Sequence, residues 1–308
     1  MNNTLNKTQR IRRIRTTLTW YSFIIVSLLC LVVLTYIPTI RTLYYSLTDM
    51  GSYGTDYSFV GLKNYRLLLT SGSFLKALKN TVVLTIYSLI KIPAGFLLAD
   101  GINNIINRRR QTFFRVSFYL PSIITGVSVI LIFKYVLKGN NGLLNMALSA
   151  IAGRPVTVGW LSDPRYSHIG VTILDLWMGI GYYMLMCLAS LQSIPRETYD
   201  AAAVDGATSF KKLIYITIPQ MKDCFAFLFV TSMIAGFARF TDLYILGGNS
   251  SAGRPSGSLQ SLLMYIYQYT FETPKYGLSS AGSVILFILT LIFAIFSVRM
   301  SGMFKDVD

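Results

Sequence analysis

Charged residues inside apolar stretches are the first candidates for chemistry in this sequence. Asp175 lies in the apolar run 169–193, and Arg239 and Asp242 lie in the run 222–246. An ionisable side chain in such a run is costly to bury and usually marks a functional site. Asp175 is therefore a candidate substrate contact, or else a structural partner of Arg239. Arg239 and Asp242 are three positions apart and can also pair with each other.

Small and aromatic residues recur at helical spacing around these charges. One helical stripe contains Asp175, Gly179, Tyr182 and Met186. A second contains Phe237, Phe240 and Tyr244. Aromatic faces cover the C–H surfaces of sugars, and forked polar groups hydrogen-bond their hydroxyls. The aromatic stripe more often packs against lipid or other helices, but Arg239 beside it favours a binding site of this kind.

Lys91 is a further charged residue within an apolar run. It lies near the middle of residues 77–99, close to Pro93. A central lysine costs about 2.5–3.5 kcal/mol on membrane insertion scales. We therefore expect Lys91 to face the interior of a helix bundle or a partner, rather than to extend toward the membrane surface.

Residues typical of enzymes and metal sites are scarce. The single histidine, His168, cannot by itself build a metal site or a catalytic triad. Three cysteines lie in apolar runs without metal or disulfide spacing: Cys30, Cys187 and Cys224. The patterns GxSxG, HExxH and GxxxxGK followed by Ser or Thr are absent. We expect a non-enzymatic chain that holds no cofactor or metal of its own.

The composition is that of a membrane protein. The 308 residues are 53% hydrophobic and 13% charged, whereas soluble proteins contain roughly 25% charged residues. The net charge of +15 would suit a nucleic-acid partner. However, the basic residues lie beside apolar runs, where Lys and Arg orient helices and contact anionic lipid. We predict lipid contact and no nucleic-acid binding.

Six apolar runs are long enough to cross a bilayer. The predicted spans are residues 18–40, 77–99, 113–137, 169–193, 222–246 and 280–299. Residues 1–16 form a basic arm before a single domain, 17–308. Six spans place both termini on one side, and the cluster Arg108–Arg110 favours the cytoplasm for that side. The polar segment 195–219 is then cytoplasmic as well.

Segment 195–219 has the pattern of two short helices separated by a glycine. Pro195 can open the first helix, and Glu197 and Asp200 suit its positive end. Gly206 can adopt the left-handed conformation that ends a helix, which Asp205 could adopt only with strain. The second helix can begin at Thr208 or Ser209, carries Phe210 on an apolar face and is closed by Pro219. The alanine-lined elbow at residues 201–203 is shaped for contact with another protein.

This segment resembles the EAA loop of permease subunits in ATP-binding-cassette importers. That pattern is Glu-Ala-Ala, three residues, Gly, nine residues and Ile-x-Leu-Pro. Its elements here are Asp200-Ala201-Ala202, Gly206 and Ile216-Thr217-Ile218-Pro219, with both spacings kept. Asp200 replaces Glu and Ile218 replaces Leu, which conserves charge and bulk. The sequence around the loop and the segment FVGLKNY from Phe59 are similar to sequences of the carbohydrate-type permeases, the group that includes those of the maltose transporter.

The resemblance implies an all-α integral membrane protein with six transmembrane helices and a cytoplasmic EAA coupling-helix loop. The residues expected to contact the ATPase are Glu197, Asp200, Ala201, Ala202, Asp205, Gly206, Phe210 and Pro219. The expected partners are a second homologous permease, two cytoplasmic ATPase subunits that bind ATP and Mg²⁺, and an extracellular or periplasmic solute-binding protein. The expected location is the bacterial or archaeal plasma (inner) membrane.

The resemblance also implies positions for a sugar or oligosaccharide substrate. Positions matching Asp175, Gly179 and Tyr182 contact sugar in the maltose-transporter permease family, and Gly236 and Arg239 would line the same pocket. Tyr244 joins this set from its aromatic stripe. One alternative is an ATP-driven importer of glycerol phosphate or another anion, which Arg239 would suit. Another is a proton-coupled secondary transporter that uses Asp175, Arg239 and Asp242 as a relay.

Overall fold

A computed structural model describes residues 7–51, 57–124 and 126–301 of the chain. Nearly all of them are helical, and a single bridge between Thr48 and Phe59 is the only β pairing in these ranges. The first elements are α1 (Lys7–Leu31), η1 (Val32–Tyr36), α2 (Ile37–Tyr45), α3 (Lys63–Thr70), α4 (Gly72–Ser88), α5 (Lys91–Asn103), α6 (Arg108–Ile123), α7 (Gly126–Val136) and α8 (Leu143–Ala152). There follow α9 (Pro164–Ser193), α10 (Arg196–Val204), α11 (Ser209–Lys212), η2 (Leu213–Thr217), α12 (Ile218–Gln220), α13 (Lys222–Phe237), α14 (Thr241–Leu246), α15 (Leu262–Tyr267), η3 (Gln268–Glu272) and α16 (Tyr276–Ser301). The η elements are π-helical turns.

Four helical segments are long and apolar enough to cross a membrane. They are Thr19–Tyr45, Gly72–Asn103, Pro164–Ser193 and Tyr276–Phe296. Two bent helix pairs satisfy the same criteria together: α6 with α7, which meet at 97°, and α11–α12 with α13, which meet at 64°. Each of the six predicted spans overlaps one of these segments, and the number of spans is four, or up to six if each bent pair is one span.

The predicted ranges differ from the helices where the chain bends. The run 113–137 is interrupted after Ile123, two residues beyond Pro121, whose missing N–H weakens the end of this helix. The run 222–246 is not one helix, because α13 ends at Phe237 and α14 begins at Thr241. Helix α1 begins at Lys7, within the predicted arm 1–16, and continues past residue 17. Residues 1–6 of that arm, and 302–308 of the predicted domain, lie outside the described residues.

Side-chain caps define several helix starts. The Asp163 carboxylate accepts a hydrogen bond from Arg165 N (2.9 Å), and Pro164 follows as the first residue of α9. Hydrogen bonds from the Arg165 side chain lower the pKa of the Asp163 carboxyl below its usual value. Asn107 caps α6 in the same way, directly before the basic cluster. These local signals define where α6 and α9 begin; α9 carries many of the buried residues, whereas Pro121 is the buried residue of α6.

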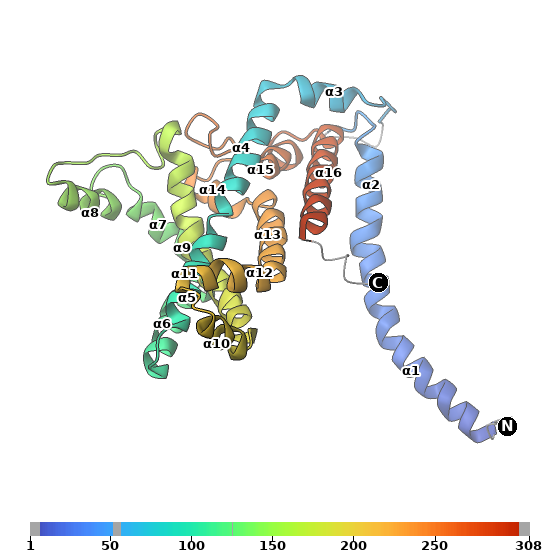
Figure 1. Cartoon of the computed structure of the whole chain (residues 1–308). Coiled ribbons are helices and arrows are strands. Elements are labelled where there is room, and N and C mark those ends of the chain that lie inside the picture. The colour runs from blue at the N-terminus through green and yellow to red at the C-terminus, as the bar shows by residue number, and fades with distance from the viewer. Residues whose placement is uncertain (1–6, 52–56, 125, 302–308) are drawn as a thin grey trace.

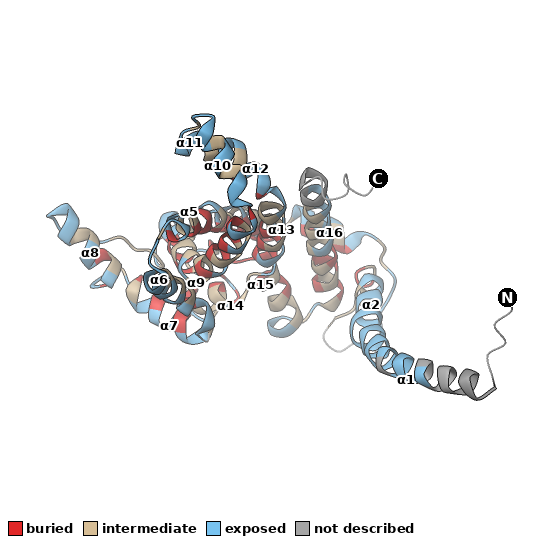
Figure 2. Cartoon of the chain, turned by 60° about the horizontal axis from the view of Figure 1, so that its bottom comes forward, coloured by how far each residue is buried: buried red, intermediate tan, exposed pale blue. Residues whose placement is uncertain are grey.

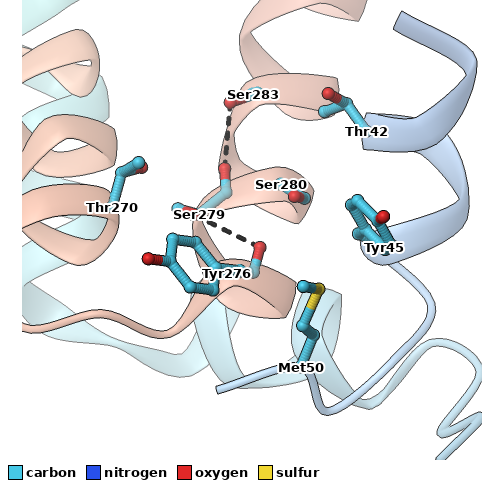
Figure 3. A pocket seen from close by; sticks show the side chains of 8 residues that line it. All are labelled: Thr42, Tyr45, Met50, Thr270, Tyr276, Ser279, Ser280 and Ser283. Atoms are coloured by element: carbon cyan, nitrogen blue, oxygen red, sulfur yellow. Dashed lines mark hydrogen bonds between the residues drawn. The ribbon is translucent and has the colours of Figure 1, made fainter. Parts of the chain in front are cut away.

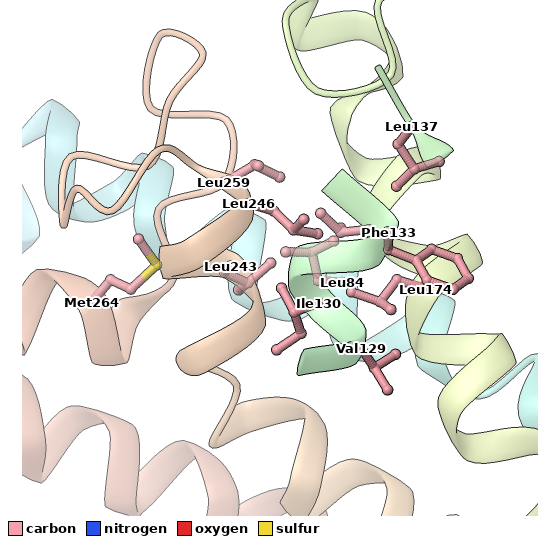
Figure 4. Close-up of a cluster of buried hydrophobic side chains, with 11 residues drawn as sticks. Leu84, Val129, Ile130, Phe133, Leu137, Leu174, Leu243, Leu246, Leu259 and Met264 are labelled. Atoms are coloured by element: carbon pink, nitrogen blue, oxygen red, sulfur yellow. The ribbon is translucent and has the colours of Figure 1, made fainter. Parts of the chain in front are cut away.

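The core is centred on α9, which contacts α4, α5, α6, α13 and α14. Close helix approach depends on small residues: a Cβ at Gly95 of α5 would lie 2.6 Å from Tyr183 Cβ of α9. Figure 4 shows a buried cluster in which Ile130 and Phe133 of α7 meet Leu174 of α9 and Leu243 of α14. This cluster fixes the position of the chain around residue 240 relative to α9.

The first span stands apart from this core. None of the most apolar window of Thr19–Tyr45 is buried, and Figure 2 shows the described part of α1 and most of α2 as exposed. Of this segment, α2 packs against α16. In Figure 1 the lower end of α1 and helix α10 lie at one end of the molecule, and α3 lies at the other. That arrangement agrees with the predicted common side for the basic arm and segment 195–219.

Candidate functional site

Four charged side chains meet in the interior. Lys91 Nζ of α5 lies 2.9 Å from Asp175 Oδ1 of α9, and Asp175 Oδ2 lies 3.8 Å from Arg239 NH1. Arg239 follows α13 and donates from both Nε (3.0 Å) and NH2 to Asp242 Oδ2 at the start of α14. Lys91 is 7% exposed, and the side chains of Asp175 and Asp242 are each 19% exposed. We call Lys91, Asp175, Arg239 and Asp242 the charge cluster.

The charge cluster lies at one wall of an open cavity of about 530 Å³. The cavity is formed by α7, α9 and the chain from the end of α13 to the start of α14. Its lining consists of Gly126, Val127, Ile130, Leu174, Asp175, Met178, Gly179, Ala235, Ala238, Arg239, Phe240, Thr241 and Asp242. A mostly apolar wall with a few convergent polar groups is typical of a binding site for a small molecule.

Three of the predicted substrate contacts line this cavity: Asp175, Gly179 and Arg239. Gly179 also makes room for the cluster, because a Cβ there would lie 2.7 Å from Lys91 Cδ. Without a side chain at residue 179, the lysine stem can pass α9 and reach Asp175.

The other three predicted contacts lie outside the cavity lining. Gly236 is buried where α13 approaches α4, and a Cβ there would lie 2.7 Å from Thr85 Cγ2. Tyr182 is exposed on α9 and packs edge-on against Tyr183. Tyr244 stacks on Phe240, with ring centroids 5.3 Å apart, and thereby supports a cavity-lining ring.

The sequence identified the members of the charge cluster but not all of its pairings. The expected contact of Arg239 with Asp242 is present, and the expected interior position of Lys91 is confirmed. The strongest partner of Asp175 is Lys91, which is 84 positions away, whereas Arg239 is the more distant neighbour. The rarity of a central lysine was the signal that could have suggested this pairing.

Segment 195–219 forms a bent, exposed pair of helices at the end of the molecule that includes α10 (Figure 1). Gly206 has φ +72°, and Ala207 N donates to Ala202 O (2.9 Å), so the glycine ends α10 as predicted. Thr208 caps α11. The Tyr199 hydroxyl bonds Thr217 Oγ1 at 2.9 Å, which ties the two helices together. Helical structure continues through the expected end at Pro219 to Gln220.

The predicted coupling residues of this segment are accessible. Phe210 is 69% exposed. Glu197, Asp200, Ala201, Asp205, Gly206 and Pro219 are exposed, and Ala202 is half-buried. An exposed aromatic ring beside a two-helix elbow provides a surface that a second protein can cover.

A second cavity, of about 310 Å³, lies between α2, η3 and α16 (Figure 3). Its lining is uncharged and rich in hydroxyls: Thr42, Tyr45, Met50, Thr270, Tyr276, Ser279, Ser280 and Ser283. Ser283 and Ser279 donate to backbone carbonyls of their own helix, at 3.0 and 3.3 Å. Within the described ranges, no three His, Cys, Asp or Glu side chains gather as metal ligands.

Known proteins match this chain in sequence and in fold. Residues 91–303 match the family described as binding-protein-dependent transport system inner membrane component. The multiple sugar-binding transport system permease protein MsmF of Streptococcus mutans is 32% identical over 286 residues, which cover 92% of this chain and 96% of MsmF. The arabinooligosaccharides transport system permease protein AraP of Bacillus subtilis is 31% identical, over 81% of this chain and 78% of AraP. A crystallised bacterial ABC transporter, involved in the import of the acidic polysaccharide alginate, contains a chain with a TM-score of 0.80 and 23% identity, covering 96% of this chain and 99% of that one.

Proposed function

Because the chain belongs to the family of binding-protein-dependent transport system inner membrane components, we propose that it is one membrane-spanning subunit of an ATP-driven importer for a sugar or oligosaccharide. The observation that carries the proposal is the family match over residues 91–303, which contain both the cavity with its charge cluster and segment 195–219. The sugar-transport relatives support the substrate class.

The importer would contain further subunits. A second, similar permease would complete the pathway beside the open cavity. Two cytoplasmic subunits would bind and hydrolyse ATP with Mg²⁺, and a solute-binding protein would deliver the sugar from outside. The complex would lie in the plasma (inner) membrane of a bacterium or archaeon, with both termini of this chain in the cytoplasm.

Coupling would run through segment 195–219. An ATPase subunit would bind the elbow between α10 and α11, and Phe210 would lie in the interface. The segment leads directly into α13, whose C-terminal end borders the cavity at Ala235. A displacement of the elbow would therefore reach the cavity wall through one helix. Exposure of the elbow and continuity of the chain support this role.

The proposed substrate contacts have different geometric support. Asp175, Gly179 and Arg239 line the cavity and would contact the sugar directly. Tyr182, Gly236 and Tyr244 remain predicted contacts whose side chains or backbone lie outside the lining. Aromatic Phe240, which the sequence placed only in a stripe, is a better-positioned ring than Tyr244 to cover a sugar face.

Reconstituted transport tests the proposal. The tagged chain is purified with its native partners, reconstituted in liposomes with internal ATP, and given its binding protein outside. We expect uptake of radiolabelled sugars from a panel of galactobiose, arabinobiose and maltose, and we expect uptake to require ATP, the binding protein and an active ATPase subunit.

The same assay separates the rival functions. Glycerol 3-phosphate serves as the anionic probe, and an imposed proton gradient without ATP serves as the alternative energy source. Uptake of glycerol 3-phosphate in place of every sugar would identify an anion importer. Sugar uptake that follows the proton gradient and ignores ATP would identify a secondary transporter and refute the proposal.

A further inference from the structure

The charge cluster is electrically balanced. It contains two cations, Lys91 and Arg239, and two carboxylates, Asp175 and Asp242, joined in one chain of contacts. Among the described residues that line the cavity, the charged ones are Asp175, Arg239 and Asp242, and Lys91 lies directly behind Asp175. A ligand in the cavity therefore meets strong local dipoles but no net charge.

Burying four charged side chains costs free energy that apolar contacts between the same helices would not cost. Charged groups are expensive to bury, and apolar residues of the same volume are often as stable as a buried ion pair. Here α5, α9 and the α13–α14 connection each contribute to a cluster at a cavity wall. Ionisable residues placed in this way at membrane depth are expected to act on what passes through.

Two atoms of the cluster keep unused hydrogen-bonding capacity. Asp175 Oδ2 and Arg239 NH1 are both buried and have no hydrogen-bond partner among the described residues. They lie 3.8 Å apart, beyond hydrogen-bond distance from each other. A hydroxyl group that separates them slightly can donate to the carboxylate and accept from the guanidinium. A ligand carboxylate in the same place could use only Arg239 and would face two carboxylates, Asp175 and Asp242.

We infer that the charge cluster selects uncharged, hydroxyl-rich substrates and excludes anionic ones, with Lys91 and Asp242 as the residues that set this selectivity. Lys91 offsets Asp175, and Asp242 offsets Arg239, so each acts through the residue that it holds. The inference rests on the proposed sugar-import function and refines it from sugars in general to neutral sugars. It also assigns roles to two residues outside the predicted set of substrate contacts.

Binding to the transporter without its solute-binding protein tests the inference, because the delivery step then contributes no selectivity. The complex of both permeases and the ATPase subunits is placed in lipid nanodiscs without ATP. The probes are α-1,4-galactobiose and α-1,4-digalacturonate, which carry hydroxymethyl groups or carboxylates on the same carbons. The measured quantity is the ratio of their dissociation constants, with assembly followed by size-exclusion chromatography.

Removing one charge should shift this ratio in a direction set by its sign. Asp242→Asn leaves one uncompensated cation, and we expect digalacturonate to bind about tenfold more tightly relative to galactobiose. Lys91→Gln should shift the ratio the other way, and the double variant K91Q/D242N should return toward the wild-type ratio. Asp223→Asn, an exposed carboxylate in the first turn of α13, is the matched control and should leave the ratio unchanged.

Each result bears on the inference. An unchanged ratio in an assembled Asp242→Asn or Lys91→Gln complex would overturn it, as would a double variant that departs further from wild type than either single variant. Failure of both single variants to assemble would also overturn it, because the cluster would then be a structural clamp. Loss of ATP-driven sugar uptake alone would count against the proposed function, since this binding assay contains no ATP.

Discussion

At the scale of single residues, Gly179 and the contacts of Arg239 allow the charge cluster to form beside the cavity. Residue 179 of α9 has no side chain, and this leaves room for the Lys91 stem on its way to Asp175. Gly179 therefore has two roles: it leaves space for Lys91, and it lines the cavity. Arg239 is held by Asp242 and by a weaker contact to Val171 O at 3.4 Å, which fixes its guanidinium beside α9.

A large side chain at residue 179 should strongly reduce transport without dissociating the complex. In Gly179→Leu the new side chain displaces the Lys91 stem and occupies the cavity, so we expect the initial rate of ATP-driven sugar uptake to fall at least tenfold. Gly179→Ala should have a smaller effect, because the clashing Lys91 Cδ belongs to a flexible side chain. Gly101→Leu on α5 is the control, since a Cβ there meets nothing within 4 Å. Normal uptake by Gly179→Leu would remove this position from the pathway.

At the scale of elements, bends between helices carry the functional geometry. The 64° bend before α13 turns segment 195–219 away from the span that follows it. The end of α13 at Phe237 places Arg239 and Asp242 on a short connection beside α9. In a straight helix over 222–246, Phe240 and Tyr244 would lie on the same face as Phe237. Because the helix ends at Phe237, Phe240 instead lines the cavity, and Tyr244 stacks on its ring outside the lining.

The elbow at Gly206 should be sensitive to backbone conformation and insensitive to side-chain volume. Its φ of +72° is left-handed, and a Cβ there meets nothing within 4 Å. Asn tolerates this conformation, Ala adopts it at a cost of about 1–2 kcal/mol, and Pro cannot adopt it. We therefore expect stimulation of ATPase activity by the loaded binding protein to decrease in the order Gly206, Asn, Ala and Pro, and to be lost in Gly206→Pro.

Membrane levels of these three variants serve as the control, because coupling is expected to fail while the chain stays in the bilayer. Normal ATPase stimulation in a membrane-inserted Gly206→Pro transporter would show that the elbow does not transmit movement.

At the scale of the whole molecule, the core and the first span differ in how they are stabilised. Parts of Gly72–Asn103 and Pro164–Ser193 are buried within the chain, whereas none of the most apolar window of Thr19–Tyr45 is buried. Lipid or the proposed second permease would cover that surface. The cavity of about 530 Å³ is likewise open, and the proposed second permease would close it.

Cysteine accessibility tests whether the bent pair α6–α7 crosses the bilayer. In a variant whose three native cysteines are replaced, single cysteines are placed at Asn104, before α6, and Asn140, after α7. We expect a membrane-impermeant maleimide added outside intact cells to label residue 140 and not residue 104. Permeabilised cells should show labelling at both positions, which serves as the control. Protection of residue 140 together with residue 104 would make the pair a re-entrant loop and reduce the number of spans.

The sequence by itself determined the features that depend on neighbouring residues. Apolar length predicted the long helices, the Asp-Ala-Ala triplet with Gly206 predicted the bent segment, and the cost of a charge in hydrocarbon predicted that Lys91 faces inward. Only the tertiary structure decided which faces meet. The pairing of Lys91 with Asp175 and the position of Gly236 against Thr85 depend on helix rotation and crossing distance. Packing between segments far apart in the chain sets both quantities, and the pattern within one helix does not contain them.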